Sequence, residues 1–111
     1  MNQSLRDEVA QLHARICSGL ADPNRILLLY ALSDRPRSVS DLAAQLEAAQ
    51  PSVSRHLKIL RDCGLVTAER DGQSVIYFLT DDRVIGALDL LRAVLADQLE
   101  NQGILAPRAR V

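Results

Sequence analysis

The sequence has few aromatic residues, only two cysteines and almost no net charge. Aromatic side chains make up 3% of its 111 residues, whereas apolar residues make up 48%. Such a chain is expected to fold as one domain around Leu, Val, Ile and Ala, a composition that favours helices. Its 13 basic and 14 acidic residues give a net charge of −1. This balance excludes a protein that coats nucleic acid through bulk charge, but it leaves room for a local basic surface.

Long apolar runs and targeting signals are also missing. The apolar stretch 26–32 is too short to span a bilayer. Residues 1–18 carry several charged side chains and lack the apolar centre of a signal peptide. We therefore expect a cytoplasmic protein with no membrane partner. Cys17 and Cys63 do not make a disulfide framework, and in a reducing cytosol both are expected to be thiols.

Apolar spacing and capping residues predict two helices in the first third of the chain. Apolar side chains one turn apart mark residues 4–20, with Ser4 as the expected N-cap. Asp22 followed by Pro23 is typical of a helix start. The run 24–32 that follows is apolar on most sides. Because such a helix is usually buried, we expect it to lie at the centre of the domain.

Two further helices joined by a tight turn are predicted in the middle of the chain. Residues 33–38 have the composition of a polar turn, and Ser40 is the expected N-cap of a helix that ends at Leu46. The next helix is expected to begin at Pro51 and to end at Gly64 as its C-cap, with Val53, Leu57 and Leu60 one turn apart on its inner face. A short turn between two helices is typical of a helix-turn-helix.

A β-hairpin is predicted after this pair. The β-prone runs 66–70 and 73–79 are separated by Asp71 and Gly72, a strong two-residue hairpin signal. The register that this turn dictates pairs Arg70 with Gln73, Ala68 with Val75 and Val66 with Tyr77. The last two pairs are apolar and lie on one face, which supports the prediction.

The last predicted helix starts at Thr80 or Asp81 and has a long apolar face. That face consists of Val84, Leu88, Leu91, Leu95 and Leu99. It exceeds what one small domain needs, as does the face of the first helix, so we expect a two-fold dimer through both terminal helices. Alternatively, both helices wrap their own core. The domain would cover residues 1–102, and residues 103–111 would form a disordered tail.

These elements predict a mostly α fold with a β-hairpin wing, a winged helix-turn-helix of order α-α-α-α-β-β-α. The second helix of such a pair enters the major groove and contacts bases mainly with its N-terminal residues. The base-reading candidates are therefore Gln50, Ser52, Ser54 and Arg55. The candidates for phosphate are Lys58 and Arg61 on the helix, with Arg70 and Gln73 on the hairpin tip for the backbone or minor groove. A solvated helix face and a bare hairpin tip remain the alternatives.

Three segments occur in a specific order along the chain: 20–25 (LADPNR), 54–66 (SRHLKILRDCGLV) and 71–77 (DGQSVIY). Together they resemble the ArsR/SmtB family of bacterial repressors, and the similarity extends over residues 16–95. The resemblance implies a homodimeric repressor that leaves its operator when it binds a metal or reacts through thiols. The turn departs from the family, since many members have Gly where Glu47 stands and a larger apolar residue where Ala48 stands.

The resemblance also implies where metal sites would lie, and two of them lack their ligands here. The stretch around Val39 has no cysteine, and Arg83 stands where the last-helix site needs an imidazole beside Asp81. Cys63 occupies a position that some cadmium- or lead-sensing members use. Those members have a second thiol one turn earlier, at the position of Ile59 in this chain, so Cys63 alone makes a poor site.

Two inducer models remain. His13 and Cys17 lie one turn apart and could contribute to a site for a soft metal ion such as Cd, Zn or As, with help from acidic residues of a partner. Cys17 and Cys63 could instead form a redox switch if the fold brings their Cα atoms within about 7 Å. Both cysteines could also be ordinary packing residues.

The function predicted from these observations is a DNA-binding repressor that binds an inverted-repeat operator as a homodimer and is released by an inducer. The alternatives are a winged-helix protein-interaction module and a constitutive DNA-binding protein with no inducer. An enzyme is not expected, because the chain has no Ser/His/Asp set, no glycine-rich phosphate loop and no paired catalytic carboxylates in a plausible pocket.

Overall fold

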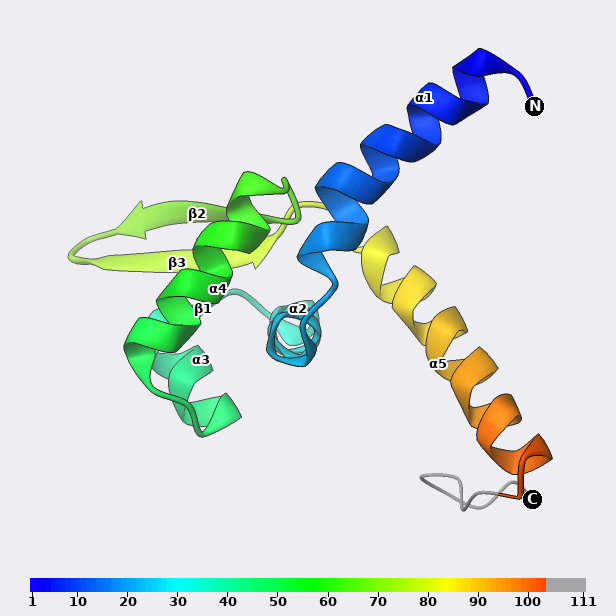
Figure 1. Cartoon of the computed structure of the whole chain (residues 1–111). Helices are drawn as coiled ribbons and strands as arrows, with labels where there is room; N and C mark the ends of the chain where they lie inside the picture. The colour runs from blue at the N-terminus through cyan, green and yellow to red at the C-terminus, as the bar shows by residue number, and fades with distance from the viewer. Residues whose placement is uncertain (104–111) are drawn as a thin grey trace. The chain divides into compact units, whose positions relative to one another are not determined.

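The computed structural model describes residues 1–103, which form helices and one small antiparallel sheet (Figure 1). Most of the predicted tail lies outside the described residues. The elements are α1 (Gln3–Gln11), the π-type turn η1 (Leu12–Cys17), α2 (Pro23–Asp34), β1 (Arg37–Ser38), α3 (Val39–Leu46), α4 (Gln50–Asp62), β2 (Val66–Asp71), β3 (Ser74–Leu79) and α5 (Arg83–Asn101). They divide into two compact units, one ending at Asp81 and one beginning at Asp82. None of the described helices is long and apolar enough to cross a membrane.

The core of the first unit is built around α2, as its all-round apolar sequence predicts. This helix contacts α3, α4 and β3. Its Leu28 and Leu29 are completely buried, and so are Leu42, Leu57 and Leu60 from the two helices that follow. Because three helices contribute to one aliphatic core, the position of α4 depends on the packing of α2 and α3.

Two predicted helix caps are corrected by the structure. The first helix is capped by Asn2, whose Oδ1 accepts from the backbone N–H of Leu5 at 2.7 Å, and not by Ser4. The third is capped by Ser38, whose Oγ accepts from the N–H of Asp41 at 3.2 Å, and not by Ser40. In both, the true cap stands two residues before the expected one, because each segment offers two capping side chains and only one has the extended backbone that a cap needs.

The starts of α2 and α5 were predicted with unequal success. Asp22 caps α2 as expected, with its Oδ1 accepting from the N–H of Asn24 at 2.8 Å, and Pro23 occupies the first helical position. The last helix begins at Arg83 and not at Thr80 or Asp81. Asp82 precedes it without a side-chain capping bond, so the acidic residues before the helix misled the prediction.

A third strand, β1, lies where the sequence predicted only a polar turn. Arg37 and Ser38 pair with Tyr77 and Ile76 of β3, which gives the antiparallel order β1-β3-β2. A two-residue strand cannot show the alternation by which strands are recognised in a sequence. It ties the start of α3 to the hairpin.

The hairpin forms as predicted, but its register was wrong by two residues. The strands pair Asp71 with Ser74, Arg70 with Val75 and Ala68 with Tyr77. The two-residue turn is therefore Gly72-Gln73 and not Asp71-Gly72. Gly72 has φ +64°, whereas Gln73 does not have a positive φ. A glycine at the first turn position is typical of a type II′ turn, which competes with the Asp-Gly type I′ turn expected from the sequence.

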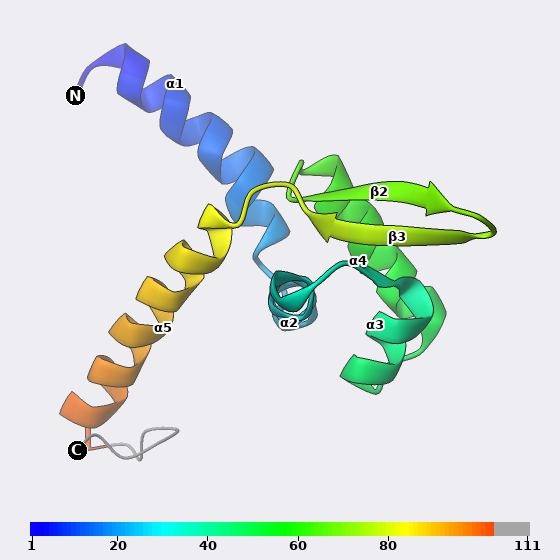
Figure 2. The same cartoon turned by 180° about the vertical axis from the view of Figure 1, so that it is seen from behind.

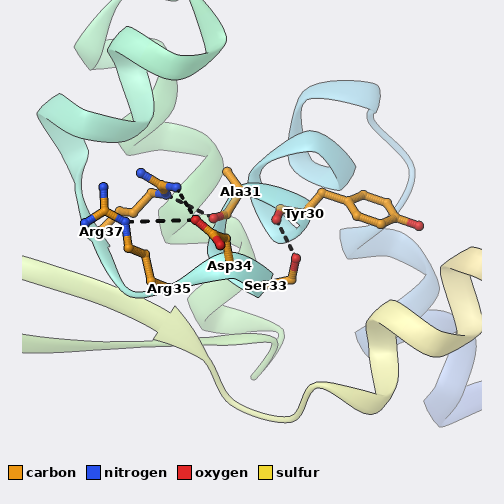
Figure 3. A network of polar contacts seen from close by, with 6 residues as sticks. All are labelled: Tyr30, Ala31, Ser33, Asp34, Arg35 and Arg37. Carbon is orange, nitrogen blue, oxygen red and sulfur yellow. Dashed lines mark hydrogen bonds and ion pairs between the residues drawn. The ribbon is translucent and has the colours of Figure 1, made fainter.

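Arg37 joins the end of α2 to β1 (Figure 3). Its Nε donates to the carbonyl oxygen of Ala31 at 3.0 Å, and its Nη2 donates to Asp34 Oδ2 at 2.8 Å. The Arg37 side chain is only 11% exposed, while that of Asp34 is 70% exposed. The guanidinium satisfies a carbonyl that the helix itself leaves unpaired, so this side chain acts as a C-terminal cap.

Candidate nucleic-acid interface

The turn between α3 and α4 is closed by a residue in the left-handed conformation. Glu47 has φ 53°, the only positive φ among the described non-glycine residues. The N–H of Ala48 donates to the carbonyl of Ala43 at 2.9 Å, which closes the end of α3. Glu47 stands where the resemblance places Gly in many family members, and its backbone has the conformation that favours Gly.

The helix α4 begins with Gln50, so this residue lies in the first turn and not just ahead of the helix, as the sequence suggested. Gly64 ends the helix as predicted, with φ +78°. The N–H of Leu65 donates to the carbonyl of Leu60, and that of Gly64 to the carbonyl of Arg61, both at 2.9 Å. This double closure is a Schellman motif, and it turns the chain directly into β2.

The inner and outer faces of α4 are as different as the sequence predicted. Val53, Leu57 and Leu60 are buried. The predicted DNA contacts on this helix lie outside the core: Ser52 is half-buried, and Gln50, Ser54, Arg55, Lys58 and Arg61 are exposed. Lys58 Nζ lies 3.0 Å from Asp62 Oδ2, an exposed pair that a phosphate could displace at little cost. Arg55 has no hydrogen-bond or ion-pair partner within residues 1–103.

The hairpin lies beside α4 in both views (Figure 1, Figure 2). The two remaining predicted contacts, Arg70 and Gln73, are exposed at or next to its turn. The corrected register places Gln73 in the turn itself and Arg70 opposite Val75. The structure thus holds an exposed polar helix face and an exposed hairpin tip on one compact unit, the arrangement with which winged helix-turn-helix proteins contact DNA.

One polar connection to α4 was missed by the sequence prediction. Arg25 Nε donates to the carbonyl of Gly19 at 2.8 Å, and its Nη2 donates to the carbonyl of Ser18 at 3.3 Å. Its Nη1 lies 3.4 Å from Nδ1 of His56 on α4. These residues are far apart in sequence, so only the motif around Asp22 and Pro23 could have drawn attention to Arg25. His56 is half-buried.

The candidate sensing residues are His13, Cys17 and Cys63, and they lie on two different helical segments. His13 and Cys17 are exposed on η1, and Cys63 is half-buried at the end of α4. A Cβ built on Gly19 would lie 3.0 Å from Cys63 Sγ, so this thiol packs against the segment that follows Cys17. Within residues 1–103, no group of three or more His, Cys, Asp or Glu side chains could hold a metal ion.

Comparison with known proteins gives matches over most of the chain. Residues 22–68 match the family model "Bacterial regulatory protein, arsR family". The HTH-type transcriptional regulator CmtR of Mycobacterium tuberculosis is 42% identical over 97 residues, which cover 86% of this chain and 81% of that protein. A probable mercury resistance operon repressor of Streptomyces lividans is 39% identical over 84 residues, covering 76% and 67% of the two chains.

Solved structures of other proteins also match most of this chain. The crystal structure of Rv0081 from M. tuberculosis superposes with a TM-score of 0.75 at 34% identity and covers 85% of this chain and 95% of that one. The solution structure of the homodimeric winged helix-turn-helix domain of Mb0332 from Mycobacterium bovis gives a TM-score of 0.76 at 26% identity, with coverage of 91% and 93%.

Proposed function

Since this chain belongs to the ArsR family of bacterial DNA-binding transcriptional regulators and is not an enzyme, we propose that it binds an inverted-repeat operator as a homodimer. In this proposal the two copies of α4 enter successive major-groove segments of double-stranded DNA. The two hairpins contact the flanking backbone or minor groove. The operator is then palindromic because the protein dimer has two-fold symmetry.

The outer face of α4 is the observation that carries the proposal. This helix bears three basic residues and one acidic residue in a chain of net charge −1. Gln50, Ser54 and Arg55 are exposed in its N-terminal half, where such helices contact base edges. Arg55 is free to donate to guanine with both arms of its guanidinium, the commonest specific contact in the major groove. Lys58 and Arg61 follow it and are suited to phosphate.

The uncovered apolar faces of the first and last helices support the homodimer. Val9 and Leu12 on the N-terminal segment are 49% and 47% exposed. Leu91 and Leu95 on α5 are 60% and 51% exposed. Apolar rows of this kind on two helices are expected to be covered by a second copy of the chain, and the relative Mb0332 is described as homodimeric.

Sedimentation velocity tests the dimer with a matched pair of variants. Leu95→Asp puts a charge in the centre of the apolar row, whereas Ala93→Asp puts the same charge on the opposite side of α5. We expect the first to sediment as a monomer and the second as a dimer. A dimer that both variants retain would contradict the role of this row.

DNase I footprinting on the DNA upstream of the gene tests the operator. We expect two protected half-sites related by an inverted repeat. Arg55→Ala is expected to weaken specific binding by about 1–3 kcal/mol, because it removes a base contact. Arg35→Ala removes the same charge from an exposed position on the α2–β1 connection and serves as the control. Equal affinities of the two variants would contradict the assignment of Arg55.

For the inducer, we propose a thiol-reactive species or a soft metal ion that acts through Cys17 and Cys63, with His13 as a further ligand candidate. Cys63 packs against Gly19, two residues from Cys17, so both thiols belong to one corner of the first unit. The Streptomyces relative named as a mercury resistance operon repressor favours a thiolate-binding ion. Within the described residues of one chain, no group of three such ligands is present, so a metal ion would need further ligands from the partner copy.

Fluorescence anisotropy on the same upstream DNA tests this inducer model. The protein is titrated reduced, then with diamide, Hg(II), Cd(II), As(III) or Zn(II), as wild type and as Cys17→Ser and Cys63→Ser. Release by one agent that either serine variant abolishes would support the model. Binding that no agent and no variant changes would favour a constitutive DNA-binding protein, and undetectable binding would favour a protein-interaction module.

A further inference from the structure

The contact between Arg25 and His56 joins the N-terminal helical segment to the helix that we assign to the major groove. Arg25 stands on α2, its two carbonyl partners Ser18 and Gly19 end the segment that begins with α1, and His56 stands on α4. We propose that Arg25 is a positioning residue for α4, which acts through His56 and touches no DNA itself. This inference rests on the proposed role of α4.

The chemistry of the two side chains determines the direction of the contact. A guanidinium has only donors, so the Nδ1 of His56 must accept. Arg25 uses Nε and Nη2 on backbone carbonyls, which leaves Nη1 for the ring. Because the guanidinium is planar and rigid, fixing two of its nitrogens also fixes the third. The backbone at Ser18 and Gly19 therefore sets where the His56 ring can lie.

A second contact holds the same helix at the same corner. Cys63 Sγ packs against Gly19, with a Cβ position on Gly19 only 3.0 Å away. His56 and Cys63 are seven positions apart, which places them on one face of α4 and about 10 Å apart along its axis. One contact is a hydrogen bond and the other is close packing, and at that separation along the axis the two together resist a tilt of α4 relative to the segment that ends at Gly19.

Tilt matters because base contacts require accurate placement. A recognition side chain must be held within about 0.5 Å of its productive position. If the helix must first be oriented, part of the free energy of DNA binding is used to order it. The loss of the Arg25–His56 contact is therefore expected to lower affinity for specific DNA without changing the number of phosphates that the protein neutralises.

Anisotropy titrations on a duplex of the gene's upstream DNA test the proposal. The variants are Arg25→Met, His56→Ala, their combination, and Arg35→Met as the charge-matched control on an exposed arginine. His56→Ala leaves both bonds from Arg25 to the backbone in place, so it tests the contact even if Arg25→Met folds poorly. Urea unfolding of each variant allows affinity to be expressed per folded protein, and titrations at several salt concentrations give the salt slope.

We expect Arg25→Met and His56→Ala each to weaken specific binding about 3- to 10-fold, the scale of one hydrogen bond. The combined variant should be no weaker than Arg25→Met, because both changes break one contact. The salt slope should equal that of wild type. Affinities equal to that of Arg35→Met would overturn the proposal. So would a salt slope reduced by about 0.9 in Arg25→Met, because that marks a direct phosphate contact.

Arg55→Ala, measured in the same series, separates the positioning role of Arg25 from the DNA-reading role of α4. If it weakens binding while the Arg25 and His56 variants match the control, the positioning role is wrong and the role of α4 stands. If Arg55→Ala binds as wild type does, α4 is not the reading helix and both proposals fall.

Discussion

The close approach of Gly19 to Cys63 predicts a measurable coupling between these two residues. Gly19 is buried and has no positive φ, so alanine is compatible with its backbone and should gain about 0.5–1 kcal/mol from lower chain entropy. The new Cβ would lie 3.0 Å from Cys63 Sγ and 3.2 Å from Leu65 Cδ1. Overpacking of this kind costs about 1–3 kcal/mol. We expect Gly19→Ala to destabilise the protein by about 1 kcal/mol.

The loss of stability caused by Gly19→Ala should depend on the sulfur atom of Cys63. Cys63→Ala removes the contact at 3.0 Å and leaves the Cβ of residue 63 at 3.4 Å, an ordinary contact distance. In that background only the contact with Leu65 Cδ1 at 3.2 Å is still tight, so Gly19→Ala should cost about 1 kcal/mol less than it does in wild type, which appears as a coupling of that size in a double-mutant cycle. Urea unfolding at one fixed protein concentration measures all four proteins, since the stability of an oligomer depends on concentration. An equal cost of Gly19→Ala with and without the sulfur would refute this reasoning.

Three further substitutions have predictable effects on stability. Glu47→Gly should stabilise the protein by about 0.5–1 kcal/mol, because it relieves a left-handed φ of 53°; urea unfolding that shows a loss would contradict this. Arg37→Ala should cost about 1–3 kcal/mol, since the 11% exposed guanidinium leaves the carbonyl of Ala31 unpaired, and an unchanged midpoint would show that water replaces it. Gly72→Ala should cost about 1–2 kcal/mol at the hairpin turn, where φ is +64°; thermal melts that coincide with wild type would contradict the turn assignment.

The main helices and the hairpin could be predicted because their signals are local. Apolar residues one turn apart marked the inner face of α4, and Asp22 with Pro23 marked the start of α2. The register of the hairpin could not be decided in the same way, because Asp71-Gly72 and Gly72-Gln73 are both acceptable two-residue turns. The pairing along the full length of the two strands selects the Gly72-Gln73 turn.

The features that the sequence did not reveal depend on contacts between distant segments. Arg25 and His56 are 31 residues apart, and neither residue type alone indicates that they meet. The same holds for Cys63, because only the structure places Gly19 against its sulfur. The candidate DNA contacts were easier to choose, because burial of one face of a helix assigns the opposite face to solvent.

Sequence discrimination by α4 is the central claim, and one competition experiment tests it most directly. Wild type and Arg55→Ala are titrated against the upstream operator duplex and against a scrambled duplex of the same length and composition at one salt concentration. For wild type we predict a preference of at least about 10³ for the operator. For Arg55→Ala we predict a preference lower by about 1–3 kcal/mol, with binding to scrambled DNA little changed. The same preference in both proteins would contradict the account.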